Sequence, residues 1–321
     1  IKGVIIMNIK RIGLTALAAS LVSVSAYAGE MSVSGGASIG LKNTSKSSTG
    51  KSWTMGNQLD FSGSGELDNG MTVSLAFTLD QADDSTTGIT NAPFDSHSVT
   101  VSSDAMGTLV FSGEGGSSAQ SSIDTTAAGD LWDNGSGFTS PLSAEAGNNS
   151  LMYTLPSFVD DVSVKASYSP GGAGGASATS FGIGYTGVEG LSFDYAIGDT
   201  ETVGAMAEHT TILASYAIGS FTLGYSNTDS DVEASSSTKD EEIISYNVAY
   251  TISDDLSVAY GTETIETEGQ ATDEEGEKYN VSYTTGGVTL SATQYNFEGS
   301  GNTAGVAGEK ERWALSATFA F

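Results

Sequence analysis

The sequence predicts an all-β protein, a closed antiparallel transmembrane β-barrel of about 16 strands with a constriction loop folded into its bore. Three features support this prediction. From residue 31 onward, short segments alternate apolar and polar side chains with a period of two, as strands with one apolar face do. Tight turns and longer polar loops separate these segments in turn. The last segment has a strongly apolar face and ends on Phe321.

The first residues predict export. Lys10 and Arg11 precede an apolar run that starts at Ile12, and an A-x-A cleavage pattern follows at 26–28. These features are typical of a secretory signal peptide whose initiator is Met7. We therefore expect residues 1–6 to be an artefact of start-site choice, residues 7–28 to be the signal peptide and residues 29–321 to form the barrel.

The charge balance excludes several classes of protein. The chain has 39 acidic and 11 basic residues, a net charge of −28. Removing the expected leader takes away three basic residues and no acid, so the net charge becomes −31. Nucleic acid is not an expected partner, because binding phosphates requires Lys and Arg. The chain has no cysteine, so burial and backbone pairing must stabilise it.

The alternation divides the chain into sixteen expected strands. Hydrophobic residues make up only 38% of the chain, which suits a barrel that is apolar outside and polar inside. The apolar parity shifts between Ala292 and Tyr295, which predicts a β-bulge. The expected strands are 31–41, 53–67, 71–80, 96–103, 108–114, 150–155, 162–169, 179–186, 191–199, 210–218, 221–229, 242–252, 256–266, 277–284, 288–298 and 310–321.

Physical constraints favour a closed barrel in a membrane. One end of the expected sheet has tight turns and the other has long acidic loops, the asymmetry of an outer-membrane barrel. In lipid every backbone N–H and C=O must be paired, so the sheet must close on itself. The last strand places Trp313, Leu315, Phe319 and Phe321 on one face, which a soluble edge strand rarely exposes. A barrel of this size leaves a water-filled channel.

The segment 115–149 has no strand pattern and contains no Lys or Arg. So long an irregular segment in a compact β protein is either functional or disordered. Leu131, Trp132 and Phe138 can anchor it. The segment alone fits a loop in the bore and a loop on the surface almost equally, and the barrel pattern of the rest of the chain favours the bore. Acids at or just before this segment are expected to line the constriction: Glu114, Asp124, Asp130, Asp133 and Glu145.

Several segments occur in an order that is specific to one family. They are LDFSG at 59–63, DNGMTVSLAF at 68–77, GTLVFSG at 107–113, LMYTLPS at 151–157 with the strand 162–168, and the terminal Phe321. In these segments the chain resembles the general porins of Gram-negative outer membranes, particularly the alphaproteobacterial branch. The resemblance covers the whole expected mature chain. It implies a trimer of sixteen-stranded barrels, each with its third external loop inside.

The chain departs from this family at the expected pore wall. Porins of the family commonly oppose loop acids to a wall arginine cluster, but residues 52–164 contain fifteen acids and no Lys or Arg. Gln58, Glu114 and Thr154 stand where arginines are common. The transverse field of the typical constriction is therefore in doubt. By parity, the residues that can face the lumen are Asp60, Glu66, Asp80, Lys165, Asp194, Lys278, Lys310 and Arg312.

Acid clusters fall in the expected external loops. Two of them offer oxygen ligands for Ca²⁺ or Mg²⁺: Asp229, Asp231 and Glu233 in one, and Asp273, Glu274 and Glu275 in the other. A solvated acidic rim is the alternative. No cofactor is required by the sequence. His97 and His209 have no serine or acid at catalytic spacing, so we do not expect an enzyme.

The sequence leaves two hypotheses for function. The first is an outer-membrane channel for passive diffusion of ions and small hydrophilic solutes, with a preference for cations. Its expected partners are outer-membrane lipid, two further copies of the chain and the barrel assembly machinery, which the resemblance implies would recognise Phe321. The second is a secreted or surface-anchored β-sandwich adhesin that binds divalent cations.

Overall fold

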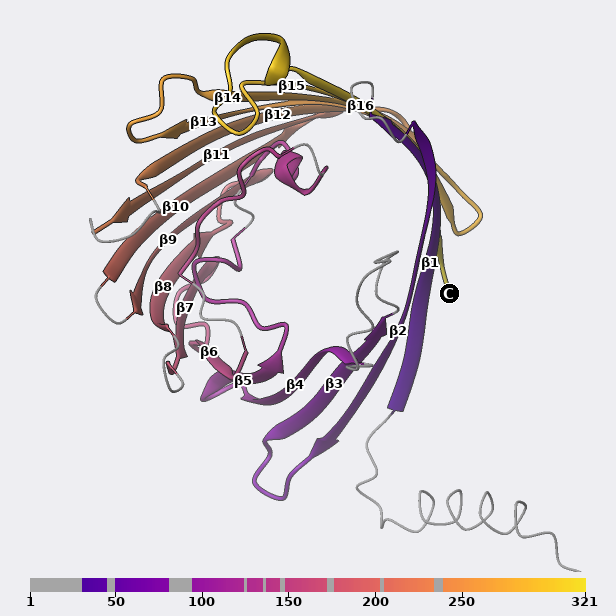
Figure 1. The fold of residues 1–321 in the computed structure, drawn as a ribbon. Coiled ribbons are helices and arrows are strands. Elements are labelled where there is room, and N and C mark those ends of the chain that lie inside the picture. Colours follow the sequence, from indigo (N-terminus) through magenta and orange to yellow (C-terminus); the bar gives the residue numbers. More distant parts are fainter. Residues whose placement is uncertain are drawn as a thin grey trace, which may run out of the picture.

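The structure, a computed structural model, describes residues 31–44, 50–80, 94–123, 126–134, 137–144, 148–171, 176–202, 205–233 and 239–321. Within these ranges sixteen strands close into one antiparallel barrel, in which each strand pairs with its sequence neighbours and β1 pairs with β16 (Figure 1). The predicted fold class is confirmed, and a closed single sheet does not support the β-sandwich alternative. The expected leader lies outside the described residues.

The expected strands agree closely with the observed ones. The observed strands are β1 (Met31–Thr44), β2 (Lys51–Glu66), β3 (Thr72–Asp80), β4 (Phe94–Ser103), β5 (Gly107–Glu114), β6 (Ser150–Thr154), β7 (Val162–Ser169), β8 (Ser177–Tyr185), β9 (Leu191–Thr202), β10 (Ala205–Ile218), β11 (Phe221–Val232), β12 (Glu241–Ser253), β13 (Leu256–Thr267), β14 (Glu274–Thr285), β15 (Val288–Glu298) and β16 (Lys310–Ala320). Two short 3-10 helices, η1 (Leu131–Asn134) and η2 (Gly305–Ala307), complete the elements. No helix among the described residues is long and apolar enough to cross a membrane.

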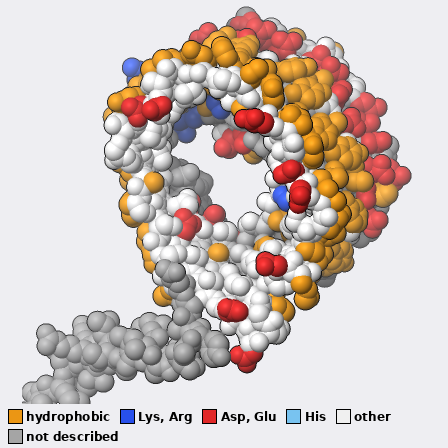
Figure 2. All heavy atoms as spheres, turned by 180° about the vertical axis from the view of Figure 1, so that it is seen from behind, with side chains coloured by type: hydrophobic (Ala, Val, Ile, Leu, Met, Phe, Trp, Pro, Cys, Tyr) orange, Lys and Arg blue, Asp and Glu red, His pale blue; other side chains and the backbone are white. Residues whose placement is uncertain are grey.

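The outer face of the barrel is apolar. Large hydrophobic side chains at alternate positions are exposed around the wall, such as Trp53, Ile183 and Leu223 (Figure 2). Aromatic rings pair across neighbouring strands, as Phe221 and Tyr250 do with ring centroids 4.7 Å apart. This band of exposed apolar side chains matches a lipid environment rather than water.

The barrel closes where the sequence predicts. Residues 36–44 of β1 pair with residues 320–312 of β16 in a continuous antiparallel register. Beyond this pairing, Gly35 and Phe321 exchange two backbone hydrogen bonds of 2.9 and 3.1 Å. The terminal aromatic residue therefore lies at the seam of the barrel.

The predicted bulge in β15 is wrong. The register of β15 with both β14 and β16 is continuous, with Val281 opposite Ala292 and Lys278 opposite Tyr295. Tyr295 and Phe297 are buried on the inner face, whereas Leu290 is exposed on the outer face. The parity of apolar residues shifts because the inner face itself becomes apolar where the internal loop covers it. Register shifts occur instead in β3, β4 and β12.

Several strands extend further at the acidic end than predicted. Asp231 lies in β11, opposite Glu208, and Glu274 and Glu275 lie in β14, opposite residues of β13. The expectation that Asp231, Glu274 and Glu275 lie in external loops is therefore wrong. Polar residues on both faces remove the alternation from which a strand is recognised in sequence, while backbone pairing with the neighbouring strand continues.

Candidate pore constriction

The segment between β5 and β6 lies inside the barrel (Figure 1). It runs along the inner wall from β7 towards β14, and η1 packs against β14. Ala119, Gln120, Leu131 and Ala144 have no exposed surface. The prediction of a loop folded into the bore is confirmed. We call residues 115–149 the constriction loop.

Hydroxyl groups of the wall accept hydrogen bonds from backbone N–H groups of the first half of the loop. We call residues 115–128 the descending limb and residues 137–149 the returning limb. Each N–H donates to a serine Oγ on a different strand, from β7 and β8 to β11 and β12. The four bonds are Ala119 to Ser167 (2.9 Å), Gln120 to Ser180 (3.2 Å), Ala127 to Ser226 (2.8 Å) and Ala128 to Ser245 (2.8 Å). An irregular segment can be buried against a wall only if its polar backbone groups are satisfied. The serines on the inner face meet this requirement.

Wall glycines allow the loop to approach this closely. A Cβ atom on Gly182 would lie 3.1 Å from the carbonyl oxygen of Ala119. On Gly261 it would lie 2.8 Å from the Cβ of Ala128, closer than real Cβ atoms come. The absence of a side chain at these positions is therefore required by the path of the loop.

Gln120 joins the two limbs of the loop. Its side chain is completely buried. Its Nε2 donates to the hydroxyl of Thr211 on β10 at 2.7 Å, and its Oε1 accepts from the backbone N–H of Ala144 at 2.8 Å. One side chain thus fixes the descending limb to the wall and the returning limb to the descending one.

An apolar cluster anchors the far end of the loop. Leu131 and Phe138 pack against Ile243, Ile265 and Phe297 of the inner wall. The ring centroids of Phe138 and Phe297 are 5.1 Å apart. This cluster explains why the inner face of β12, β13 and β15 is apolar here, although the inner face of such a barrel is generally polar.

A buried carboxylate holds the second half of the loop, the returning limb of residues 137–149. Glu274 is fully buried at the start of β14. It accepts hydrogen bonds from the backbone N–H and the hydroxyl of Thr139, and Oε1 lies 3.4 Å from the Nδ2 of Asn302. Glu274 was predicted as a metal ligand in an external loop. Its position inside the barrel, bonded to the constriction loop, does not fit that role.

Basic side chains face the bore mainly from one arc of the wall. Lys278 of β14 and Arg312 of β16 are both aligned with Tyr295 of β15, and they therefore share the inward parity. Lys42 of β1 and Arg312 line a recess of about 330 Å³ on this arc. Figure 2 shows Lys and Arg atoms gathered on this stretch of the inner wall. Sequence reasoning missed Lys42 because the expected first strand ended at residue 41.

The lysines also contact the constriction loop. Lys165 Nζ donates to Ser122 Oγ at 3.3 Å, and Lys278 Nζ donates to the carbonyl oxygens of Ala128 and Gly129 at 3.2 and 3.0 Å. A Cβ atom on Gly137 would lie 3.1 Å from Lys310 Nζ. These three lysines therefore lie where the loop meets the wall, and not at Gln58, Glu114 or Thr154, where the resemblance implies arginines.

Some of the acids lie on the neighbouring part of the wall, from β2 to β5. Asp60 accepts hydrogen bonds from Gln58 Nε2 at 2.9 Å and Thr78 Oγ1 at 2.7 Å. Both donors are neutral, so neither cancels the negative charge. Asp60 and Glu114 line the same recess of about 170 Å³ between β2 and β5. This part of the wall therefore presents carboxylates to the bore.

The remaining predicted acids are dispersed. In the loop, Asp133 is exposed on η1, and Asp130 accepts a bond of 2.9 Å from Thr126 Oγ1. Glu66 and Asp80 are exposed at the ends of β2 and β3, at the same inward parity as Asp60. Asp194 lies on β9, with its Oδ2 3.4 Å from Ser192 Oγ. Asp124 and Glu145 lie outside the described residues.

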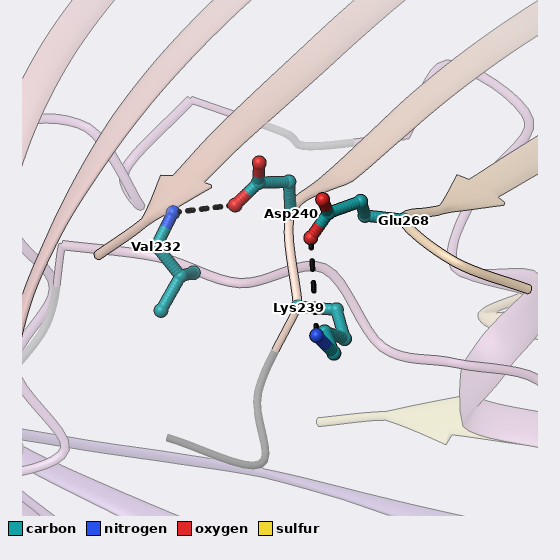
Figure 3. A network of polar contacts seen from close by, with 4 residues as sticks. All are labelled: Val232, Lys239, Asp240 and Glu268. Atoms are coloured by element: carbon teal, nitrogen blue, oxygen red, sulfur yellow. Dashed lines mark hydrogen bonds and ion pairs between the residues drawn. The ribbon is translucent and has the colours of Figure 1, made fainter. Parts of the chain in front are cut away.

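The acids at the external end make local contacts (Figure 3). Asp240 accepts a hydrogen bond of 2.8 Å from the backbone N–H of Val232, and Lys239 Nζ lies 3.9 Å from a carboxylate oxygen of Glu268. Within the described ranges, no three His, Cys, Asp or Glu side chains converge to form a metal site. Binding of Ca²⁺ or Mg²⁺ by Asp229, Asp231, Glu233, Asp273 or Glu275 therefore stays a prediction.

Solved structures of outer-membrane proteins share this fold. The chain has a TM-score of 0.67 to OmpT of Vibrio cholerae, with 16% identity over 93% of this chain and 99% of that one. A variant of the porin of Rh. blastica gives a TM-score of 0.69, with 14% identity over 91% of this chain and 100% of that one. A comparison with curated protein sequences gives no significant match.

The family follows from a match over most of the sequence. A model of Gram-negative porins matches residues 13–284. The match includes the strands from β1 to β13, most of β14 and the whole constriction loop. The chain therefore belongs to the Gram-negative porin family and is an outer-membrane channel protein.

Proposed function

We propose that the protein is a passive diffusion channel for ions and small hydrophilic solutes, and that it prefers cations. The observation that supports this is the position of the constriction loop. It covers one side of the bore, from β7 to β15, and Figure 2 shows an opening that remains through the barrel. The uncovered inner wall is polar, with Ser38, Thr54, Ser316 and Asp60 among the side chains that line its recesses.

The preference for cations follows from the balance of charge. The acids of the chain outnumber its basic residues by 39 to 11. Two unit charges about 4 Å apart interact by roughly 1 kcal/mol in water and by more near a low-dielectric wall. Carboxylates at the wall, such as Asp60 and Glu114, and at the loop, such as Asp133, therefore favour cations in the bore. The arc with Lys42 and Arg312 opposes this preference, so selectivity is expected to be moderate.

The assembly and the biogenesis are part of the same proposal. OmpT of Vibrio cholerae, which shares the fold with 16% identity, is described in a trimer form. We infer a homotrimer for this chain as well, embedded in outer-membrane lipid through the apolar outer face. Export by a signal peptide at 7–28 and insertion by the barrel assembly machinery complete the proposal.

Reversal potentials across a KCl gradient test the selectivity. The purified protein in a planar bilayer should show the sign of a cation-selective channel, more strongly at low salt because screening extends over about 10 Å at 0.1 M. Asp133→Asn should move the potential towards zero more than Asp130→Asn, because Asp133 is exposed whereas Asp130 is half-buried. Anion selectivity would refute the preference, and the absence of any conductance would refute the channel itself.

A further inference from the structure

The tip of the constriction loop turns sharply beside Lys278. We call residues 126–131 the loop tip. Gly129 has φ of +78° and Asp130 has φ of +45°, which is unusual for a residue other than glycine. Thr126 supports this turn, because its Oγ1 accepts from the backbone N–H of Asp130 at 2.6 Å and donates to the Asp130 carboxylate. The turn brings two successive carbonyl oxygens towards β14.

Lys278 donates hydrogen bonds to both of these carbonyl oxygens. Its Nζ donates to the oxygen of Ala128 at 3.2 Å and to that of Gly129 at 3.0 Å. The N–H groups of Ala127 and Ala128 point the other way, to Ser226 and Ser245. The backbone of the loop tip is thus bonded on both sides, by hydroxyl groups of β11 and β12 and by an ammonium group of β14.

We propose that Lys278 is the positioning residue of the constriction, which keeps the loop tip against the wall and so keeps the aperture at one width. The inference rests on the proposed channel function. A carbonyl oxygen requires a hydrogen-bond donor, and an ammonium group offers three N–H bonds, whereas a serine hydroxyl offers one O–H. Hydrogen bonds to a charged donor are also about twice as strong as neutral ones.

The other contacts of the loop tip cannot replace this one. Leu131 and Ala128 pack in the apolar cluster, which is not directional. Ala128 is 5% exposed, and a recess of about 250 Å³ beside it is lined by Gly129 and Lys278. Without Lys278, these two carbonyl groups would lose their charged donor, and the loop tip would lose a directional bond to β14. We therefore expect the loop tip to leave the wall more often.

Single-channel recording of three variants at Lys278 and Lys165 tests the proposal. Lys278→Gln should raise the rate of brief current transitions about tenfold, because the two charged hydrogen bonds are lost. Lys278→Arg should stay near the wild-type rate. Lys165→Gln is the matched control, since Lys165 Nζ makes a long hydrogen bond of 3.3 Å to the hydroxyl of Ser122, which lies outside the loop tip. Equal rates in Lys278→Gln and the wild type would overturn the proposal.

A reversible cross-link separates position from charge. The chain has no cysteine, and a Cβ atom on Gly224 would lie 3.3 Å from the Cβ of Ala127, close to the spacing of a disulfide. Adding Ala127→Cys and Gly224→Cys to Lys278→Gln should restore the quiet channel under oxidising conditions, and reductant should remove the effect. Transitions that persist in the cross-linked protein would show that Lys278 acts only through its charge, which contradicts the proposal.

A measurement that does not depend on ion current tests the role of Lys278 separately from the proposed channel function. A spin label on Asp133→Cys, an exposed position next to the loop tip, reports the motion of the loop in the refolded protein. Lys278→Gln should increase the mobility of the label, and Lys165→Gln should not. This result would support the positioning role even if the protein formed no channel. Unchanged mobility in Lys278→Gln would overturn it even if the channel conducts.

Discussion

Thr139 of the constriction loop gives both of its donors to one carboxylate, that of Glu274. The backbone N–H lies 2.9 Å from Oε2 and the hydroxyl lies 2.6 Å from Oε1. A carboxylate has two acceptor oxygens, whereas a glutamine side chain has one acceptor and an NH₂ group. In Glu274→Gln the amide can keep both contacts only if its NH₂ group donates to the Thr139 hydroxyl, so two hydrogen bonds to a charged group become neutral ones at a fully buried position.

We expect Glu274→Gln to lower the free energy of unfolding by about 1–3 kcal/mol, because hydrogen bonds to a charged group contribute more than neutral ones. Thr139→Val is the milder comparison, because it removes the hydroxyl and leaves the backbone bond. Thermal unfolding of the purified barrel, followed by the shift of the unheated band on detergent gels, measures both. If the two variants unfold at the same temperature as the wild type, Glu274 does not hold the returning limb.

A methyl group at Gly261 should move the loop tip. Its Cβ would lie 2.8 Å from the Cβ and 2.9 Å from the Cα of Ala128, so the loop or the strand must shift. We expect Gly261→Ala to change the single-channel conductance and to cost about 1–3 kcal/mol of stability. Gly36→Ala is the control on the uncovered wall, where the nearest atom to the new Cβ lies at 3.4 Å. An effect of equal size in both variants would point to strand propensity rather than to the loop.

Removal of Phe321 should prevent closure of the barrel. Phe321 exchanges two backbone hydrogen bonds with Gly35, and its side chain is 75% exposed on the outer face. Its loss leaves Gly35 unpaired at the seam in lipid, where unpaired backbone groups are costly. We expect the truncated protein to be nearly absent from the outer membrane, as measured by fractionation. Phe321→Tyr keeps the backbone bonds and an aromatic ring, so it should assemble, and normal amounts of the truncated protein would contradict the prediction.

Much of the barrel could be predicted from the sequence because its strands alternate so regularly. The period of two is visible wherever one face meets lipid and the other meets water. The alternation is lost where both faces of a strand are polar or both are apolar. Asp231 and Glu274 lie in strand ends that are polar on both sides, and Tyr295 and Phe297 lie where the inner face is as apolar as the outer one.

The position of the constriction loop could be predicted, but its contacts could not. Length, composition and the residues Leu131 and Phe138 indicated a packed loop. The contact of Lys278 with the carbonyl groups of Ala128 and Gly129 joins positions about 150 residues apart, as the separations of 150 and 149 show. No local pattern encodes such a pair. Serine and glycine on the inner wall are equally ordinary in sequence, and only the path of the loop gives them a role.

Shortening the constriction loop should widen the channel. Gln120 and Ala144 are already joined by a hydrogen bond of 2.8 Å, so deleting residues 121–137 leaves a loop that can close near the wall at β10. We expect the conductance to rise roughly twofold or more and larger sugars to enter in swelling assays, because side chains alone cannot fill a barrel of this width.

The same deletion uncovers an apolar surface, and this determines how the experiment is read. Leu131 is removed, so Ile243, Ile265 and Phe297 of the wall lose the cover that buries them. A deletion that folds poorly would therefore report the loss of this cover rather than the width of the bore. Adding Ile243→Ser and Ile265→Ser makes the exposed wall polar, as the rest of the inner face is, and should restore folding while keeping the higher conductance. A folded double-serine deletion with wild-type conductance would show that the constriction loop does not limit the pore.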